Sequence, residues 1–142
     1  MEKPTIGSKN YIDRALISVL KSEEGIGVGI SVTRIEGESE TDVYIGSIYI
    51  SEETGLKPCF INAMQLIEQE YGSIPEVVRT NVAFYRYSQH VRVAKRKLGV
   101  ENMAVKVYNH SKLGQASELA EDAIKRKTTI TELIGERAEI SK

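Results

Sequence analysis

Val105-Lys-Val-Tyr-Asn-His-Ser-Lys-Leu-Gly-Gln-Ala-Ser-Glu-Leu-Ala-Glu-Asp-Ala-Ile124 is the segment with the clearest strand-to-helix pattern in this chain. Apolar and polar residues alternate at its start, which is the period of a half-buried strand, and its apolar residues after Gly114 recur at helical spacing. His110 and Ser111 lie in the polar turn between the two. The carboxyl end of a strand, just before a helix, is where α/β folds place chemistry. Taken alone, such a histidine is more often a solvated loop residue.

Size and composition indicate one ordinary globular domain. The chain has 142 residues, a formal net charge of −1 at pH 7, 41% hydrophobic residues and 27% charged residues. No apolar run is long enough to span a membrane, and the first residues lack the apolar core of a signal peptide, so we expect a cytoplasmic protein with no membrane partner. The single Cys59 cannot form an internal disulfide, and no cysteine and histidine cluster predicts a structural zinc site.

Charge is distributed unevenly along the chain. Acidic residues dominate positions 36–76, where Lys57 is the only basic residue, and basic residues dominate positions 82–112, where Glu101 is the only acidic one. Lysine and arginine clustered on one helix can form a phosphate-binding surface, and the same pattern is typical of a solvated helix face. Both interpretations of the basic segment stay open.

The order of elements predicts an α/β domain. Strands are expected at 26–33 and 43–50, joined by a hairpin loop at 36–40, and then helices at 58–71, 84–98 and 116–124 alternate with strands at 74–80 and 105–108. Residues 10–20 fit a helix face and an extended strand equally well. We therefore expect a flexible leader at 1–9, one domain at 10–127, and a C-terminal extension at 128–142 that forms a short helix or tail.

With this order, the chain resembles the type 1 ribonuclease H family over residues 10–123. Tyr11-Ile12-Asp13 looks like the first strand with its aspartate, and Gly25-Ile-Gly-Val-Gly-Ile30 looks like the glycine-flanked start of the second. Val77-Val-Arg-Thr-Asn81 resembles the strand that ends in a Ser/Thr-Asp pair. The resemblance implies a five-stranded mixed sheet flanked by helices, with three antiparallel strands first and residues 10–20 beginning as the central strand.

Two further segments carry the resemblance. Asn62-Ala-Met-Gln65-Leu66 resembles the helix motif in which an Asn precedes a catalytic Glu by three residues. Lys106-Val-Tyr-Asn-His110-Ser111, followed by Ala116-Ser117-Glu-Leu-Ala120, resembles the last strand, the mobile histidine and the start of the last helix. The loop at 18–24 departs from the Gly-Asn-Pro-Gly type of loop that approaches the nucleic-acid minor groove in the family.

The chemistry that the resemblance implies is a pair of Mg²⁺ ions held by four carboxylates, one ion activating water and the other stabilising the leaving oxygen. The matched positions here are Asp13, Gln65, Asn81 and Ser117, with His110 beside them. Three of the four are uncharged, and hard divalent cations need anionic oxygen ligands. Asp13 alone would hold a metal ion weakly, so no cofactor is expected. Acids elsewhere on the helices, Glu68, Glu118, Glu121 and Asp122, could have taken over in part, although an ordinary solvated helix face explains them as well.

We therefore expect a ribonuclease H-like nucleic-acid-binding protein, for RNA/DNA hybrid or a related duplex, that is catalytically degenerate. The residues expected to bind nucleic acid are Asn62, Thr80, Arg86, Arg92, Lys95, Arg96 and Lys97. One alternative is an active endoribonuclease that uses Mg²⁺ and shifted carboxylates to cleave the RNA of hybrids. Another is a protein-interaction or homo-oligomer module anchored by Tyr44, Tyr49, Tyr85 and Tyr87.

Overall fold

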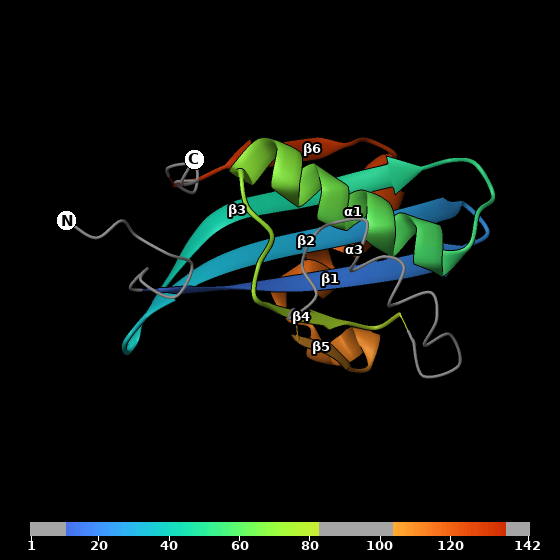
Figure 1. The fold of residues 1–142 in the computed structure, drawn as a ribbon. Coiled ribbons are helices and arrows are strands. Elements are labelled where there is room, and N and C mark those ends of the chain that lie inside the picture. Colours follow the sequence, from blue (N-terminus) through green and yellow to red (C-terminus); the bar gives the residue numbers. More distant parts are fainter. Residues whose placement is uncertain (1–10, 83–103, 136–142) are drawn as a thin grey trace.

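The computed structural model describes residues 11–82 and 104–135, which form a mixed sheet with a helix on each side (Figure 1). The elements are β1 (Ile12–Ser22), β2 (Gly25–Glu36), β3 (Ser39–Ile50), α1 (Leu56–Tyr71), β4 (Val77–Thr80), β5 (Ala104–Val107), the 3-10 turn η2 (His110–Lys112), α3 (Gln115–Arg126) and β6 (Ile130–Leu133). The stretch that fitted either a helix or a strand is therefore strand β1. The helix expected at 84–98 lies outside the described residues.

The strand order across the sheet is β5-β4-β1-β2-β3-β6. Strands β1, β2 and β3 are antiparallel neighbours, and β4 and β5 add to β1 in parallel. The predicted mixed sheet of five strands, three of them antiparallel and first in the chain, is confirmed.

The C-terminal extension differs from the expectation of a short helix or tail. Residues Ile130–Leu133 form β6, which pairs antiparallel with β3. The reason is that the outer edge of β3 presents backbone groups that a strand can pair and a helix cannot. The Thr129 hydroxyl also accepts a hydrogen bond from the Tyr49 amide at 3.0 Å. β-branched side chains at Ile130 and Thr131 suit this extended conformation.

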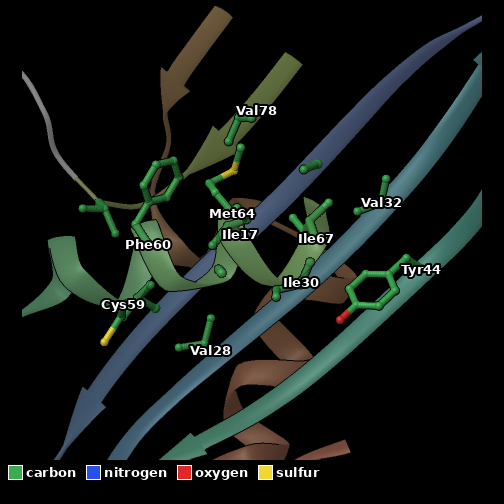
Figure 2. Close-up of a cluster of buried hydrophobic side chains, with 14 of the residues drawn as sticks. Ile17, Val28, Ile30, Val32, Tyr44, Cys59, Phe60, Met64, Ile67 and Val78 are labelled. Atoms are coloured by element: carbon green, nitrogen blue, oxygen red, sulfur yellow. The ribbon is translucent and has the colours of Figure 1, made fainter. Parts of the chain in front are cut away.

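Helix α1 packs on one face of the sheet over the main hydrophobic core (Figure 2). Strand residues at alternate positions point to this face, as the pleat requires. The core joins Ile17 of β1 and Val28 and Ile30 of β2 to Phe60 and Met64 of α1. The helix ends at Gly72, whose left-handed conformation at φ 101° lets its amide bond back to the carbonyls of the last turn.

Helix α3 packs on the opposite face, against the positions of β2 that lie between the core residues. Gly27 and Gly29 occupy those positions, and a Cβ atom at Gly29 would lie 1.8 Å from the Ala116 carbonyl oxygen. The glycines of the Gly-Ile-Gly-Val-Gly motif therefore let the helix backbone approach the strand closely. This approach places the amino end of α3 and the preceding turn η2 over β1 and β2. No helix among the described residues is long and apolar enough to cross a membrane.

Candidate functional site

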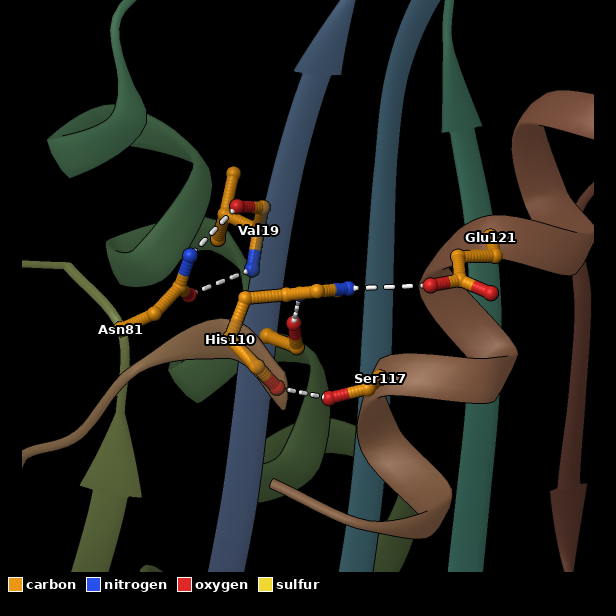
Figure 3. A network of polar contacts seen from close by, with 6 residues as sticks. Val19, Asn81, His110, Ser117 and Glu121 are labelled. Carbon is orange, nitrogen blue, oxygen red and sulfur yellow. Dashed lines mark hydrogen bonds and ion pairs between the residues drawn. The ribbon is translucent and has the colours of Figure 1, made fainter. Parts of the chain in front are cut away.

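Five polar side chains gather where β4 and β5 end: Ser18, Asn81, His110, Ser117 and Glu121 (Figure 3). We call this group the polar corner. Because β4 and β5 are parallel, their carboxyl ends meet at one edge of the sheet. The chain beyond β5 stays close to β4, since the Tyr108 amide donates to the Thr80 carbonyl at 2.8 Å. Asn81 and His110 therefore leave the sheet beside each other.

His110 is the centre of the polar corner. Its Nδ1 lies 2.5 Å from the Ser18 hydroxyl of β1, and its Nε2 lies 3.3 Å from a carboxylate oxygen of Glu121 on α3. The Ser117 hydroxyl, at the start of α3, donates to the His110 carbonyl oxygen. One imidazole thus links strand β1 to helix α3 (Figure 3).

Asn81 makes a pair of hydrogen bonds to the backbone of β1. Its Oδ1 accepts from the Val19 amide at 2.8 Å, and its Nδ2 donates to the Val19 carbonyl at 2.8 Å. The side chain thereby continues the β1 to β4 pairing one residue past the end of β4. An aspartate could not donate to the Val19 carbonyl, because an ionised carboxylate only accepts hydrogen bonds. An asparagine therefore fits this position better than an aspartate.

Comparison with known proteins gives structural matches without sequence matches. No protein-family model matches the sequence, and no curated protein matches it either. LC11-RNase H1, isolated from compost by a metagenomic approach, superimposes with a TM-score of 0.58 at 16% identity, covering 84% of this chain and 99% of that one. RNase H1 from the halophilic archaeon Halobacterium salinarum NRC-1 gives a TM-score of 0.53 at 14% identity, covering 80% of this chain and 98% of that one. The chain has a ribonuclease H-like fold. A further structure, of LC11-RNase H1 in complex with RNA/DNA hybrid, gives a TM-score of 0.55 at 17% identity, covering 81% of this chain and 98% of that one.

Within the ribonuclease H-like fold, Asp13 does not lie in the polar corner. It precedes Ser18 by five positions on β1, which is about 16 Å along an extended strand. An odd separation also sends the two side chains to opposite faces of the sheet. Asp13 accordingly faces α1, where the Tyr71 hydroxyl donates to it at 3.0 Å and the Arg34 guanidinium lies 3.8 Å away. The placement of Asp13 beside His110 and Ser117 was therefore wrong, and Ser18 is the β1 residue there.

The surroundings of Asp13 are those of a buried structural ion pair. Its side chain is fully buried, and its backbone amide donates to a Glu76 carboxylate oxygen at 2.9 Å. Arg34 also donates to the Tyr71 hydroxyl at 2.7 Å. Burial raises the pKa of the Tyr71 hydroxyl, and the nearby Asp13 carboxylate adds to this, so the hydroxyl stays protonated as a donor. Asp13 therefore links the amino-terminal end of β1 to α1 through Tyr71 and to β2 through Arg34.

The other predicted site residues are dispersed. Asn62 and Gln65 are exposed on α1, the helix on the face opposite the polar corner, and Thr80 is buried at the end of β4, where its hydroxyl accepts from the Val82 amide at 3.2 Å. Arg86, Arg92, Lys95, Arg96 and Lys97 lie outside the described residues.

Ser18 was missed because the resemblance drew attention to the only aspartate of the strand. The signal that could have found it is the pairing of β1 with the glycine motif. Ser18 pairs with Gly29, and directly opposite residues of antiparallel strands share a face. Gly29 faces α3, so its pairing partner Ser18 faces α3 as well.

The residues of the polar corner do not fit a pair of Mg²⁺ ions. Ser18, Asn81 and Ser117 are neutral, and their polar side-chain atoms form hydrogen bonds within the protein. Glu121 is the one carboxylate of the corner, and it contacts His110. In residues 11–82 and 104–135, no group of three or more His, Cys, Asp or Glu side chains could hold a metal ion. Two divalent cations need several anionic ligands to offset their repulsion.

Proposed function

We propose that this protein binds nucleic acid, an RNA/DNA hybrid or a related duplex, and does not hydrolyse it. The observation that carries the proposal is a polar corner with a single carboxylate, Glu121, on a ribonuclease H-like fold. A corner with one carboxylate repels a phosphate backbone less than a site that carries four. The solved complex of LC11-RNase H1 with RNA/DNA hybrid supports the choice of ligand.

Positive charge for phosphate binding comes from two parts of the chain. Lys112 is exposed two residues after His110, beside the polar corner. The basic residues Arg92, Lys95, Arg96 and Lys97 lie in the segment between β4 and β5. Each phosphate that a lysine or arginine neutralises releases condensed counterions, which makes affinity fall steeply with salt.

A salt-titrated shift assay tests the proposal with hybrid, duplex DNA, duplex RNA and single strands of one sequence. We expect binding at low salt that weakens as salt rises, and a loss of about tenfold or more for the double variant Lys95→Glu/Arg96→Glu. Lys125→Glu/Arg126→Glu, an exposed double reversal at the end of α3, is the control matched in charge and should have a smaller effect. Absence of binding to all four ligands at low salt would refute the proposal.

The mixtures of protein and hybrid from the shift assay also test for hydrolysis. We expect the RNA strand of the hybrid to stay intact when Mg²⁺ or Mn²⁺ is added. Metal-dependent cleavage would establish the active-enzyme alternative, and its carboxylates would then have to come from exposed acids such as Glu68 and Glu118.

The apolar edge of the sheet favours a homo-oligomer as a second candidate. Ile130 and Leu133 of β6 and the following Ile134 are exposed, 47%, 38% and 47% respectively. Of the four tyrosines expected to anchor such an interface, Tyr44 is fully buried and its hydroxyl donates to Glu70 at 2.7 Å, so it cannot serve as an anchor. Tyr49 is half-buried, and Tyr85 and Tyr87 lie outside the described residues. Light scattering after size exclusion tests this candidate, and a strict monomer would count against it.

A further inference from the structure

We infer that the polar corner is a metal-free clamp in which Ser18 and Glu121 hold His110 as a fixed cross-link between β1 and α3, with the ring hydrogen on Nε2. Ser18 is then a positioning residue of the corner. The clamp would exist whether or not the chain binds nucleic acid, because its partners all belong to the protein.

The hydrogen on Nε2 follows from the two ring contacts. An ionised carboxylate accepts hydrogen bonds and cannot donate them, so the ring nitrogen that faces Glu121 must carry a hydrogen. In the neutral imidazole the other nitrogen, Nδ1, then has a free lone pair. The Ser18 hydroxyl, 2.5 Å from Nδ1, is therefore the donor in that contact. The opposite tautomer would turn a lone pair of Nε2 toward the carboxylate.

Backbone contacts hold the same histidine in place. Ser117 donates to its carbonyl oxygen, and the Leu113 amide donates to that oxygen too, at 3.1 Å. His110 is therefore bonded through both ring nitrogens and through its backbone. A histidine held at three points is poorly suited to the mobile role that the sequence resemblance implied.

The contacts from Ser18 through His110 to Glu121 follow the order of a catalytic triad, in which a nucleophile contacts a base and the base contacts an orienting acid. Ser18 has no solvent exposure, since it lies in the middle of β1 under η2 and α3. A substrate cannot reach its hydroxyl, so the contacts serve to fix the histidine and not to activate the serine.

Metal binding would compete with the clamp. A cation bound to His110 Nδ1 would need the one lone pair that accepts from Ser18, and a cation drawn to Asn81 would pull its amide away from the Val19 backbone. Breaking these bonds would leave buried polar groups unpaired, and neutral oxygens would offer little in return. The hydrogen-bonded arrangement therefore competes with a metal site that uses His110 Nδ1.

Nitrogen-15 NMR of the full chain tests the clamp. At about pH 8.5, where an ordinary imidazole is neutral, we expect His110 to show a hydrogen on Nε2 and none on Nδ1. Ser18→Ala should shift the Nδ1 resonance and lower Tm by about 3–8 °C. Ser31→Ala, a buried serine on the same face that donates to Gln115, should leave the His110 resonances unchanged.

A second pair of variants and a metal titration complete the test. Glu121→Ala should introduce the Nδ1 tautomer, and Glu118→Ala, an exposed acid on the same helix, should not. Millimolar MgCl₂ should move neither the His110 resonances nor Tm. A hydrogen on Nδ1 in the unmodified protein, or a saturable response to Mg²⁺, would overturn the clamp. If Ser18→Ala fails to fold, the tautomer and the titration of the unmodified protein decide. Failure to bind nucleic acid would leave these results untouched.

Discussion

Asp13 shows at the scale of one residue how a carboxylate can serve the fold and not the site. Its charge is fully buried against Arg34 and Tyr71, and removing one partner of such a pair leaves the other charge uncompensated. We expect Asp13→Asn to lower the free energy of unfolding by about 3 kcal/mol. Urea denaturation followed by circular dichroism measures it.

The control for Asp13 is Asp42→Asn, an exposed aspartate that accepts from the Thr33 hydroxyl at 3.1 Å. That change should lower the free energy of unfolding by about 1 kcal/mol or less. Folded Asp13→Asn should keep the nucleic-acid affinity of the unmodified chain, because the residue faces away from the polar corner. A selective loss of binding with unchanged stability would return Asp13 to the binding site.

The position of helix α3 depends on its close contact with strand β2. Gly29 lies under the Ala116 carbonyl and Gly27 under the Ala120 carbonyl, both too close for a side chain. We expect Gly29→Ala to lower the free energy of unfolding by about 3 kcal/mol or more, since the whole helix would have to move away. Urea denaturation measures this, and displaced His110 resonances would show the shift of α3.

Gly46→Ala is the matched control for the element scale. Its added methyl would meet side-chain atoms of Ile30 and Thr131 at 3.3 to 3.6 Å, and side chains yield more easily than a helix backbone. We therefore expect Gly46→Ala to lower the free energy of unfolding by less than Gly29→Ala does. Equal losses in the two variants would show that α3 does not depend on the glycine surface of β2.

The whole molecule is a layered sheet to which β6 adds a short, largely exposed edge. Ile130 and Leu133 bury only part of their surface, so we expect a chain ending at Lys127 to fold in one cooperative transition, with the free energy of unfolding lowered by about 1–2 kcal/mol. Thermal and urea unfolding measure this. A chain ending at Gly135, which keeps β6, is the control. Loss of cooperative unfolding in the shorter chain would place the domain boundary beyond residue 127.

Local patterns were enough to predict most of the architecture. Alternation identified β2 and β3, helical spacing and Gly72 identified α1, and the strand and helix around His110 identified the corner. Such patterns reflect the side-chain periods of strands and helices, which depend on neighbouring residues alone. They did not distinguish helix from strand at residues 10–20, and they did not predict β6, because an edge strand depends on an unpaired neighbour that is distant in sequence.

The sequence alone predicted most of the elements in their order, the ribonuclease H-like arrangement that this order implies, and the neutral residues Asn81 and Ser117 near His110. Which residue of β1 lies beside them depends on the assembled sheet. Asp13 and Ser18 lie on one strand, and pairing with Gly29 of β2 turns Ser18, and not Asp13, toward α3. The physical reason is that the face of a strand residue is set by its register with the neighbouring strand, and register is a property of the assembled sheet.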